Sequence, residues 1–559
     1  MKLGIKISEE KQDNNFVLQA GILAAAGIIS RIIGLLYRSP LTAVIGVLGI
    51  GYYQSAYKIY TIVLLVSSYS IPSAISKVIA QKLAVKEYRN AHRIFKCAMA
   101  YVLVVGGVAS LLLFFGANWF LEEQAAASVL KVFAPTIFIY GILGVLRGYF
   151  QAHRSMVQTS VSQVLEQIAN AVVSVGAAVF LIRHMIGTLD MPTDEALKIR
   201  RATFGAMGSA LGTGAGVFVA LLFVAAVYGI NRKLILKRIA NDRHDRTESY
   251  GTIVKTITLI VTPFILSTAI YNLSDVVNAK MYTEWIPGVL GTDRTAAYTD
   301  FGVFSGLAQT IAQIPIAFAS AMASAVIPSV ASYIVSGKLE EAKEKIGVAV
   351  KSTMVISIPS AVGLFVLAKP VTALLFPSQL DETLTQAGFL LMTLALSVVF
   401  YALSTLNSSV LQGLGKVNTP IVNAAIALAI QTAAVYGLLR YTGLDLYSMA
   451  IANTLYSGMM CVLNQWAVRR AIGYQQEYQK TFGVPALAAL LMGVVAFGIY
   501  EGLRLAGLSM RIAVLPAVAV AVVVYFVAML KFGGLDEQEL LGFPKGHLLV
   551  KVAKKCRLM

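Results

Sequence analysis

Four residues between positions 16 and 38 combine small size and positive charge at a helical spacing. Gly27, Arg31, Gly34 and Arg38 follow one another at intervals of four, three and four residues, which places them on one face of an α-helix. The glycines leave room on this face, and an arginine guanidinium binds phosphate through two parallel hydrogen bonds. The pattern therefore predicts a site for an anion.

Further polar and ionisable side chains lie in the apolar stretches that follow. Lys58 comes one helical turn after Gln54, and Arg147 shares a face with Tyr140, Gly144 and Gln151. Residues 157–182 carry an unusually polar face. A charge at the centre of a bilayer costs about 2.5–3.5 kcal/mol, so such side chains should face a hydrated cavity or pair with one another. The candidate substrate-binding residues are Arg31, Arg38, Lys58, Arg147, Gln163, Glu166 and Asn170.

These residues also have plainer interpretations. Each cation could pair with an acid or extend to a lipid headgroup. Glu166 could be a counter-ion to Arg31, a group that titrates protons, or both. Asp275 has amide neighbours one turn away, a combination that suits a small cation or a proton. The candidate ion-coupling residues are Asp275, Asn278 and Glu166.

The composition shows where these residues must reside. Of the 559 residues, 57% are hydrophobic and only 13% are charged, and the mean hydropathy is +0.73. An average soluble domain is about 45–50% apolar and about 25% charged. A soluble enzyme and a disordered protein are therefore excluded, and we expect an integral membrane protein built of α-helices.

Fourteen stretches are apolar and long enough to span a bilayer, which takes about 20 residues. With the N-terminus in the cytoplasm, 32 basic residues fall on the cytoplasmic side and 12 on the outer side. This bias follows the positive-inside rule and explains most of the net charge of +18 without nucleic acid. The expected spans are residues 16–38, 52–76, 96–117, 129–150, 157–182, 202–229, 253–279, 299–326, 346–368, 384–411, 419–439, 446–468, 482–503 and 510–530.

An internal repeat divides these spans. Residues 71–83 match residues 327–339 at six of thirteen positions, and residues 151–159 resemble residues 412–419 at nearly the same offset. Two landmarks in the same order predict a duplicated unit of six helices, in a parallel repeat suited to alternating access. We expect an N-lobe at 1–230, a cytoplasmic linker at 231–255, a C-lobe at 256–470, and two further helices with a basic tail at 471–559.

Other classes of function find little support. The three cysteines and five histidines form no metal-ligand motif, and no phosphate-binding loop of the GxxxxGK[ST] type is present. We therefore expect no cofactor, and energy from a Na⁺ or H⁺ gradient or from the membrane potential. An enzyme acting on a lipid would need an acid in a large outer loop, and no expected outer loop is long. A cation-exporting multidrug antiporter would need unpaired acids in its cavity, and an accessory scaffold remains a further alternative.

Several motifs resemble those of a known family. Residues 30–38 (SRIIGLLYR), the Ile71-Pro72-Ser73 turn, and residues 147–151 (RGYFQ) followed by residues 162–167 (SQVLEQ) are similar to the polysaccharide-transporter branch of the MOP flippase superfamily. Within it the resemblance is greatest to the group of stage V sporulation protein B and YtgP, relatives of the lipid II flippase MurJ. The resemblance covers nearly the whole chain.

The resemblance implies fourteen helices in two lobes, a MATE-like fold, and transfer of a polyprenyl-pyrophosphate-linked saccharide from the inner to the outer leaflet. Arg31 and Arg38 match two first-helix arginines of MurJ, with a spacing of seven instead of six, and Lys58 replaces an arginine. Thr310 lies near the position of an arginine in the eighth helix, so the glycan could be lipid II or a teichoic acid, capsule or O-unit precursor. We expect a monomer in the bacterial plasma membrane, with both termini in the cytoplasm.

Overall fold

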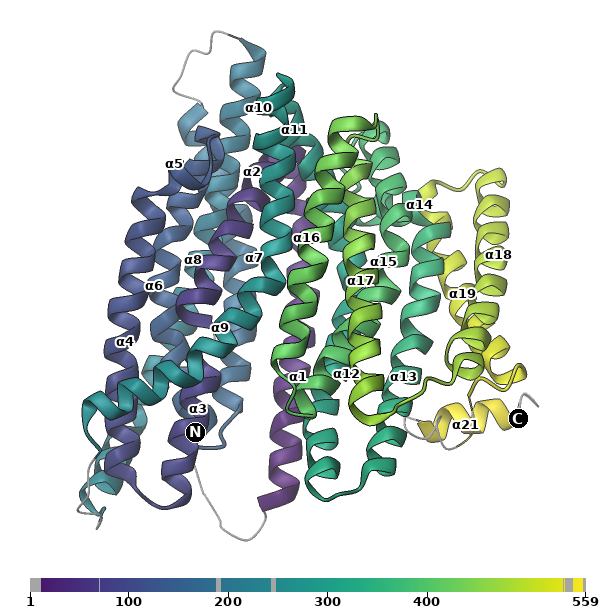
Figure 1. Ribbon diagram of the computed structural model, residues 1–559. Coiled ribbons are helices and arrows are strands. Elements are labelled where there is room, and N and C mark those ends of the chain that lie inside the picture. The colour runs from purple at the N-terminus through teal and green to yellow at the C-terminus, as the bar shows by residue number, and fades with distance from the viewer. Residues whose placement is uncertain are drawn as a thin grey trace. The chain divides into compact units, whose positions relative to one another are not determined.

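Helices account for all the regular structure that could be described. The computed structural model describes residues 12–69, 71–186, 193–242, 248–535, 537 and 546–555, and no β-strand occurs among them. The expectation of an all-α protein is therefore confirmed. The chain forms two compact units, Met1–Lys280 and Met281–Met559, and each is described by itself (Figure 1).

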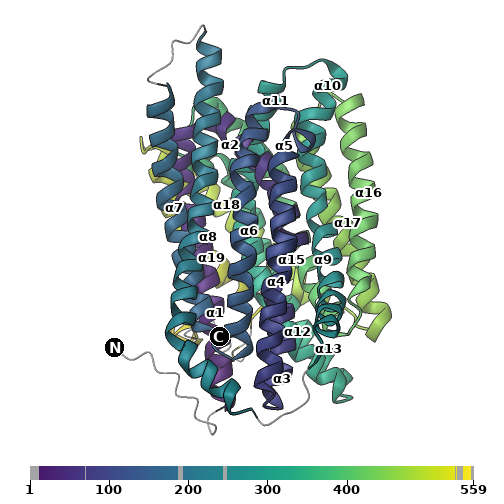
Figure 2. The ribbon, with the colours of Figure 1, turned by 90° about the vertical axis from the view of Figure 1, so that its left-hand side faces the viewer.

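The first unit holds nine α-helices and one π-helical turn among its described residues. In chain order they are α1 (Gln12–Leu36), α2 (Arg38–Leu64), η1 (Leu65–Tyr69), α3 (Ile71–Ala84), α4 (Tyr88–Phe115), α5 (Ala117–Phe120), α6 (Gln124–Ala152), α7 (Val157–Ile186), α8 (Asp194–Ala240) and α9 (Tyr250–Lys280). The helices α7 and α8 lie side by side in both Figure 1 and Figure 2.

The second unit continues the helical pattern with three further π-helical turns. Its described elements are η2 (Met281–Trp285), α10 (Ile286–Leu290), α11 (Arg294–Phe301), η3 (Gly302–Ala308), α12 (Gln309–Val335), α13 (Leu339–Val366), α14 (Ala368–Leu375), α15 (Asp381–Gly413), α16 (Asn418–Tyr441), α17 (Tyr447–Ile472), η4 (Gln479–Gly483), α18 (Val484–Leu505), α19 (Met510–Lys531) and α21 (Gly546–Lys555).

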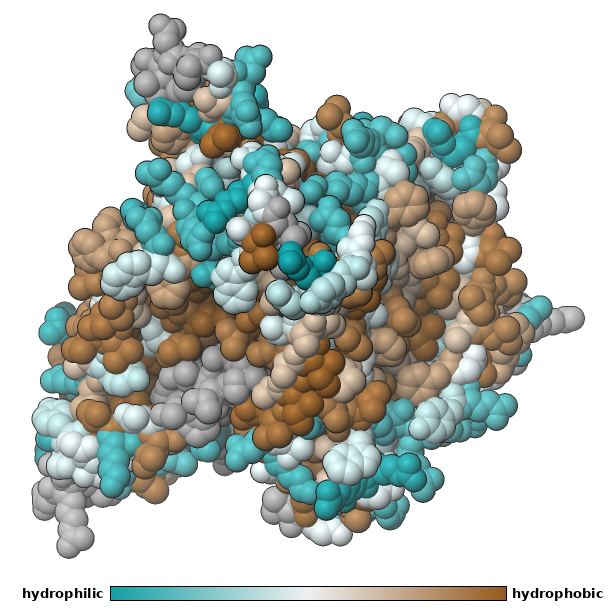
Figure 3. Space-filling model, turned by 45° about the horizontal axis from the view of Figure 1, so that its top comes forward, coloured by the Kyte–Doolittle hydropathy of each residue, from teal (hydrophilic) through white to brown (hydrophobic). Residues whose placement is uncertain are grey.

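Many of these helices have the length and composition of membrane spans. Ten helices among the described residues qualify, or eleven when α1 and α2, bent by 47° at their junction, count as one broken span. The face in Figure 3 shows hydrophobic side chains along the flanks of the helices and hydrophilic ones gathered toward their ends. The chain is therefore a multi-pass membrane protein, and the count of fourteen spans stays a prediction.

Helix boundaries differ from expectation near the N-terminus. The residues expected as an outer loop, 39–51, are helical and belong to α2. A single non-helical residue, Gly46 (φ 70°, ψ 172°), interrupts this helix, and a positive φ of this kind is accessible to glycine because it has no Cβ. The expectation of a loop at 39–51 was therefore wrong, because the chain is helical on both sides of Gly46.

The expected linker at 231–255 is also largely helical. Residues 231–240 complete α8, and α9 begins at Tyr250; residues 243–247 lie outside the described part of the chain. The helix α8 has 47 residues, more than twice the ~20 needed to cross a bilayer. The helix α9 belongs to the first compact unit, because that unit extends to Lys280. The boundaries expected for the two lobes stay a prediction.

Candidate functional site

The polar face of α7 lies against the glycine-containing face of α1. Asn170 Nδ2 donates a hydrogen bond of 3.5 Å to the Tyr37 hydroxyl at the end of α1. A Cβ built on Gly34 would lie 3.7 Å from the side-chain oxygen of Gln167. The amide of Gln167 therefore lies close to α1 at Gly34, with room for a methyl group between them. The sequence predicted the two polar faces but not their mutual contact.

The arginines of this region lie at the bent junction of α1 and α2. Arg31 is exposed near the end of α1, and Arg38 is half-buried at the first position of α2. The charge of Arg38 lies within electrostatic reach of the Tyr53 and Tyr57 hydroxyls. Both arginines have polar or electrostatic partners. Arg38 thus places a positive charge near two hydroxyl groups of α2.

A row of tyrosines on α2 packs on α6, and the sequence reasoning missed it. The ring of Tyr60 stacks on that of Phe133 at 4.8 Å between centroids, and Tyr53 and Tyr57 contact the same ring at 5.4 and 5.8 Å. The Tyr53 hydroxyl also contacts Thr213 Oγ1 at 3.3 Å. The spacing of four and three residues among these tyrosines is the signal that would have revealed a common face. The row fixes the rotation of α2.

Arg147 is neutralised by the acid of the same region. Its Nη2 atom lies 2.8 Å from Glu166 Oε2, and its Nε donates to Ser162 Oγ at 2.9 Å. Ser162 in turn donates to the carbonyl of Thr159 at 2.7 Å. Only 7% of the Arg147 side chain and 17% of the Glu166 side chain are exposed. The structure therefore gives Glu166 the counter-ion role toward Arg147, where the sequence analysis had considered Arg31.

Lys58 pairs with the candidate ion-coupling acid. Its Nζ lies 2.6 Å from Asp275 Oδ2, which joins α2 to α9. The side chains are 16% and 34% exposed, so neither member of the pair is fully buried. Asn278, nearly one turn after Asp275, is buried, and its Oδ1 has no hydrogen-bond partner within the described part of the chain. Two candidates that the sequence assigned to different roles, Lys58 and Asp275, are therefore direct partners.

The candidate residues gather around the same part of α2. Tyr57, next to Lys58, lies within electrostatic reach of both Arg38 and Glu166. Gln163 is half-buried on α7, one turn before Glu166. The six ionisable candidates of this unit comprise four cations and two acids, so their net charge is +2. They are Arg31, Arg38, Lys58, Arg147, Glu166 and Asp275.

The polar residues of the second unit mostly bond to one another. Asn423 donates to Asn464 at 2.8 Å, which donates to Ser408 at 2.8 Å. Asn407 donates to Gln465 at 3.0 Å. These bonds join α15, α16 and α17, and they are the kind of interhelical hydrogen bond that stabilises membrane bundles.

A second polar cluster in this unit was not predicted. The Tyr282 hydroxyl donates to Asp445 Oδ1 at 2.9 Å, and Gln386 donates to Asp300 Oδ1 at 3.2 Å. Burial, followed by the charges of Asp300 and Asp445, raises the pKa of Tyr282. These residues are far apart in the sequence, so no spacing pattern could have indicated the cluster. Among the described residues, no group of histidine, cysteine and acidic side chains could hold a metal ion.

Comparison with known proteins places this arrangement in a family. Residues 94–507 match the family model described as lipid II flippase MurJ. The lipid II flippase MurJ of Bacillus subtilis (strain 168) is 24% identical over 551 residues, which cover 93% of this chain and 96% of that protein. Stage V sporulation protein B of the same organism is also 24% identical, over 95% of this chain and 98% of its own length.

Solved structures agree on the fold. A lipid II flippase MurJ in an inward closed conformation has a TM-score of 0.63 at 15% identity and covers 92% of this chain and 98% of its own. An inward-facing multidrug resistance MATE family transporter of the MOP superfamily has a TM-score of 0.60 at 16% identity, over 82% of this chain and 98% of its own. The expected MOP/MATE-like fold is confirmed, and the roles of the site residues stay predictions.

Proposed function

Because the chain belongs to the lipid II flippase MurJ family, we propose that it moves a polyprenyl-pyrophosphate-linked saccharide, the peptidoglycan precursor lipid II, from the inner to the outer leaflet. As a member of this family it is a transporter and not an enzyme. The mechanism is alternating access, in which a site within the membrane opens to one side and then to the other.

The net charge of +2 on the candidate residues of the first unit carries this proposal. A pyrophosphate diester has one ionised oxygen on each phosphorus atom, so its charge of two negative units would be balanced there. The Arg147–Glu166 and Lys58–Asp275 pairs contribute no net charge. Arg31 and Arg38 are the proposed contacts to the pyrophosphate, because a guanidinium group binds a phosphate through two parallel hydrogen bonds.

The remaining candidates have roles that follow from their contacts. Glu166 holds Arg147 in place, and the amides of Gln163 and Asn170 offer donors and acceptors to the hydroxyl groups of the saccharide. Lys58 is shared between the cargo and Asp275. An arriving phosphate that draws Lys58 away would leave Asp275 with an uncompensated negative charge, which a cation or proton would then neutralise.

This exchange suggests how transport is driven. Asp275 and Asn278 are the proposed ion-coupling residues, with Glu166 as the other candidate. The buried Oδ1 of Asn278, without a hydrogen-bond partner among the described residues, is an oxygen of the kind that hard cations bind. The ion would be Na⁺ or H⁺. The membrane potential could contribute as well, because moving one charge across 100 mV is worth about 2.3 kcal/mol.

The proposed architecture is the one expected from the sequence. It has fourteen spans in two six-helix lobes with two further helices, in a monomer of the bacterial plasma membrane with both termini in the cytoplasm. The ten or eleven candidate spans among the described residues support a many-span topology. The internal repeat and the loop charges support the lobes and the orientation.

A cation-coupled multidrug antiporter of the same fold is the second candidate. The similarity to MATE family transporters favours it, although similarity at this level concerns the fold alone. The ion pairs disfavour it, because the two acids that an organic cation would need, Glu166 and Asp275, are each held by a basic side chain. A flippase for a teichoic acid, capsule or O-unit precursor differs only in its glycan.

The experiment that separates these candidates is complementation of a strain depleted of its lipid II flippase. Cells that express this chain should grow and should present lipid II at the outer leaflet, detected by an impermeant reagent. Rescue would select lipid II. Failure of a well-expressed protein, together with cation-coupled efflux of a cationic dye, would instead select the antiporter.

A further inference from the structure

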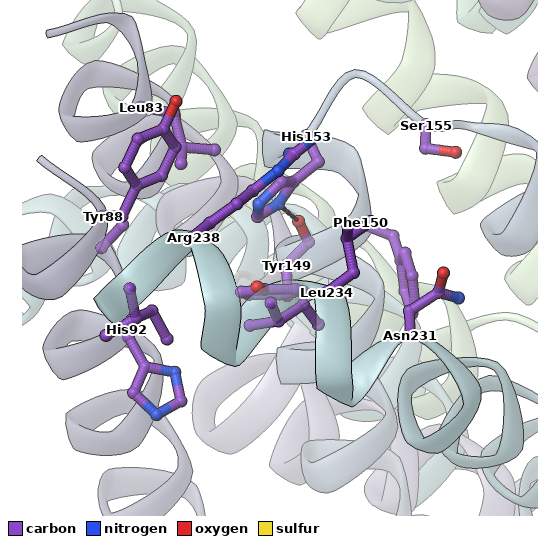
Figure 4. A pocket seen from close by; sticks show the side chains of 13 residues that line it. Leu83, Tyr88, His92, Tyr149, Phe150, His153, Ser155, Asn231, Leu234 and Arg238 are labelled. Atoms are coloured by element: carbon purple, nitrogen blue, oxygen red, sulfur yellow. Dashed lines mark hydrogen bonds between the residues drawn. The ribbon is translucent and has the colours of Figure 1, made fainter. Parts of the chain in front are cut away.

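A small cavity lies at one end of the first unit, where α3, α4, α6 and α8 approach one another. Its volume is about 50 Å³, and Figure 4 shows the side chains around it. None of its lining residues belongs to the candidate transport site. They are Leu83, Tyr88, Ala91, His92, Tyr149, Phe150, His153, Ser155, Asn231, Leu234, Ile235, Arg238 and Ile239.

The hydrogen bonding of His153 defines what this cavity can recognise. His153 Nδ1 lies 2.9 Å from the carbonyl oxygen of Tyr149. A carbonyl can only accept, so Nδ1 carries the proton and Nε2 is an acceptor in the neutral ring. Burial and the nearby charge of Arg238 lower the pKa of His153, and the bond to Tyr149 acts in the opposite direction. The ring is therefore neutral at pH 7 and offers an acceptor to a hydroxyl group.

Arg238 supplies the positive charge of the cavity. It is the one lysine or arginine among the lining residues, and its charge acts on both His153 and Tyr149. It makes no ion pair within the described part of the chain. Nearby acids bind other groups: Asp242 accepts from the Arg89 backbone N–H at 2.7 Å, and Glu87 pairs with Lys82 at 3.1 Å.

The surroundings of the cavity indicate a lipid and not a soluble ion. Its walls are mainly aliphatic and aromatic. The adjacent end of α8 exposes the apolar side chains of Ile230, Leu234 and Leu236, at 82%, 42% and 47%. Basic residues alternate with them at Arg232, Lys233 and Lys237. A basic segment next to the end of an apolar helix is attracted to the anionic lipids of the cytoplasmic leaflet.

We propose that this cavity binds the head group of an anionic phospholipid whose head group carries free hydroxyls, such as phosphatidylglycerol. The phosphate lies against Arg238, a head-group hydroxyl donates to His153 Nε2, and the acyl chains leave along the exposed side chains of Ile230 and Leu234, which lie one turn apart on α8. This function is separate from cargo transport. Bound lipid would contact α4, α6 and the C-terminal end of α8, and would hold these three helices together. The chain continues from this end of α8 to α9.

The test measures lipid binding to the full-length protein by native mass spectrometry, with dioleoyl phosphatidylglycerol and dioleoyl phosphatidylcholine as probes. The wild type should retain phosphatidylglycerol selectively. Arg238→Gln should weaken its binding about tenfold, the usual effect of losing one charge-assisted contact. Arg232→Gln removes the same charge from an exposed position of the same helix and should have little effect. Arg238→Lys keeps the charge and should restore part of the binding.

Two further arms identify the ligand chemistry. Inorganic phosphate at millimolar concentration should not displace phosphatidylglycerol, because phosphate has no acyl chains and cannot make the apolar contacts with α8. His153→Leu should abolish the preference for phosphatidylglycerol over a phosphatidylmethanol, which has the same charge but no head-group hydroxyl. Equal losses in Arg238→Gln and Arg232→Gln would show a general surface attraction and would overturn the site. Unchanged binding in a folded Arg238→Gln protein would overturn it as well.

Discussion

Charge inside the membrane is mostly paired in this protein. Arg147 is bound by Glu166 and Ser162, and Lys58 is bound by Asp275. Removing one member of a buried pair leaves the other without compensation, which costs far more than removing both. Residues of this kind can therefore be tested through stability as well as through transport.

The Arg147–Glu166 pair gives the first prediction. Glu166→Gln should lower the stability of the protein by roughly 3 kcal/mol because Arg147 stays buried without a counter-charge. The measurement is thermal unfolding in detergent, detected as the loss of the folded peak in size-exclusion chromatography. The double variant Arg147→Met with Glu166→Leu should unfold near the wild-type temperature. The exposed Glu195→Gln is the control, and a double variant no more stable than Glu166→Gln would contradict this interpretation.

The Lys58–Asp275 pair gives a second prediction, in which stability and transport separate. Lys58→Asp alone places two acids together and should lower the unfolding temperature. Adding Asp275→Lys restores the attraction and should restore that temperature. Flipping should nevertheless stay impaired, because the cation now resides on α9 and the acid faces the cargo. Full recovery of flipping in the exchanged pair would show that Lys58 holds the helices together and does not contact the cargo.

The sequence revealed these residues but not their partners. The polar face of α7 follows from helical periodicity and could be read directly. The expectation that Arg31 and Arg38 share one face of a single helix was wrong, because α1 ends at Leu36 and Arg38 begins α2 beyond a bend of 47°. The partner of Lys58 lies 217 positions away, and that of Arg147 lies on the next helix. Such pairs depend on how helices rotate and pack, which periodicity does not determine. The cluster of Tyr282, Asp300 and Asp445 escaped prediction for the same reason.

At the scale of elements, α7 packs closely on α8. Gly208, Gly212 and Gly216 form a stripe at four-residue intervals on α8. A Cβ at these positions would overlap backbone atoms of Ala178, Ser174 and Glu166 on α7. Small residues at this spacing let membrane helices approach closely. The stripe therefore positions the helix that carries Gln163, Glu166 and Asn170.

This packing can be tested with a single methyl group. Gly212→Ala should force the two helices apart and cost roughly 1–3 kcal/mol, the usual range for overpacking. Gly229→Ala is the matched control on the same helix, because nothing lies within 4 Å of a Cβ there. It should be neutral or slightly stabilising, since alanine favours helix more than glycine does. The measurement is the thermal unfolding temperature of the two variants under identical conditions. Equal unfolding temperatures would contradict the proposed role of the stripe.

For the whole molecule, hydropathy correctly predicted an all-α membrane protein. A chain so rich in apolar residues must form helices in a membrane, because only helices and closed barrels satisfy backbone hydrogen bonds there. Boundaries were harder to predict. Residues 39–51 are helical, and α8 extends far beyond the apolar stretch within it. Hydropathy reports contact with lipid, whereas helical structure can continue past the membrane surface.

The proposed pyrophosphate contacts, Arg31 and Arg38, can be tested by measuring lipid II flipping in cells. Outer-leaflet lipid II is quantified in cells depleted of their own flippase that express the variant Arg31→Gln with Arg38→Gln. The control is Arg200→Gln with Arg201→Gln, which removes two exposed arginines from α8. The control should give wild-type levels, and the Arg31/Arg38 variant should give no outer-leaflet lipid II above background. Normal flipping by a well-expressed Arg31/Arg38 variant would contradict it.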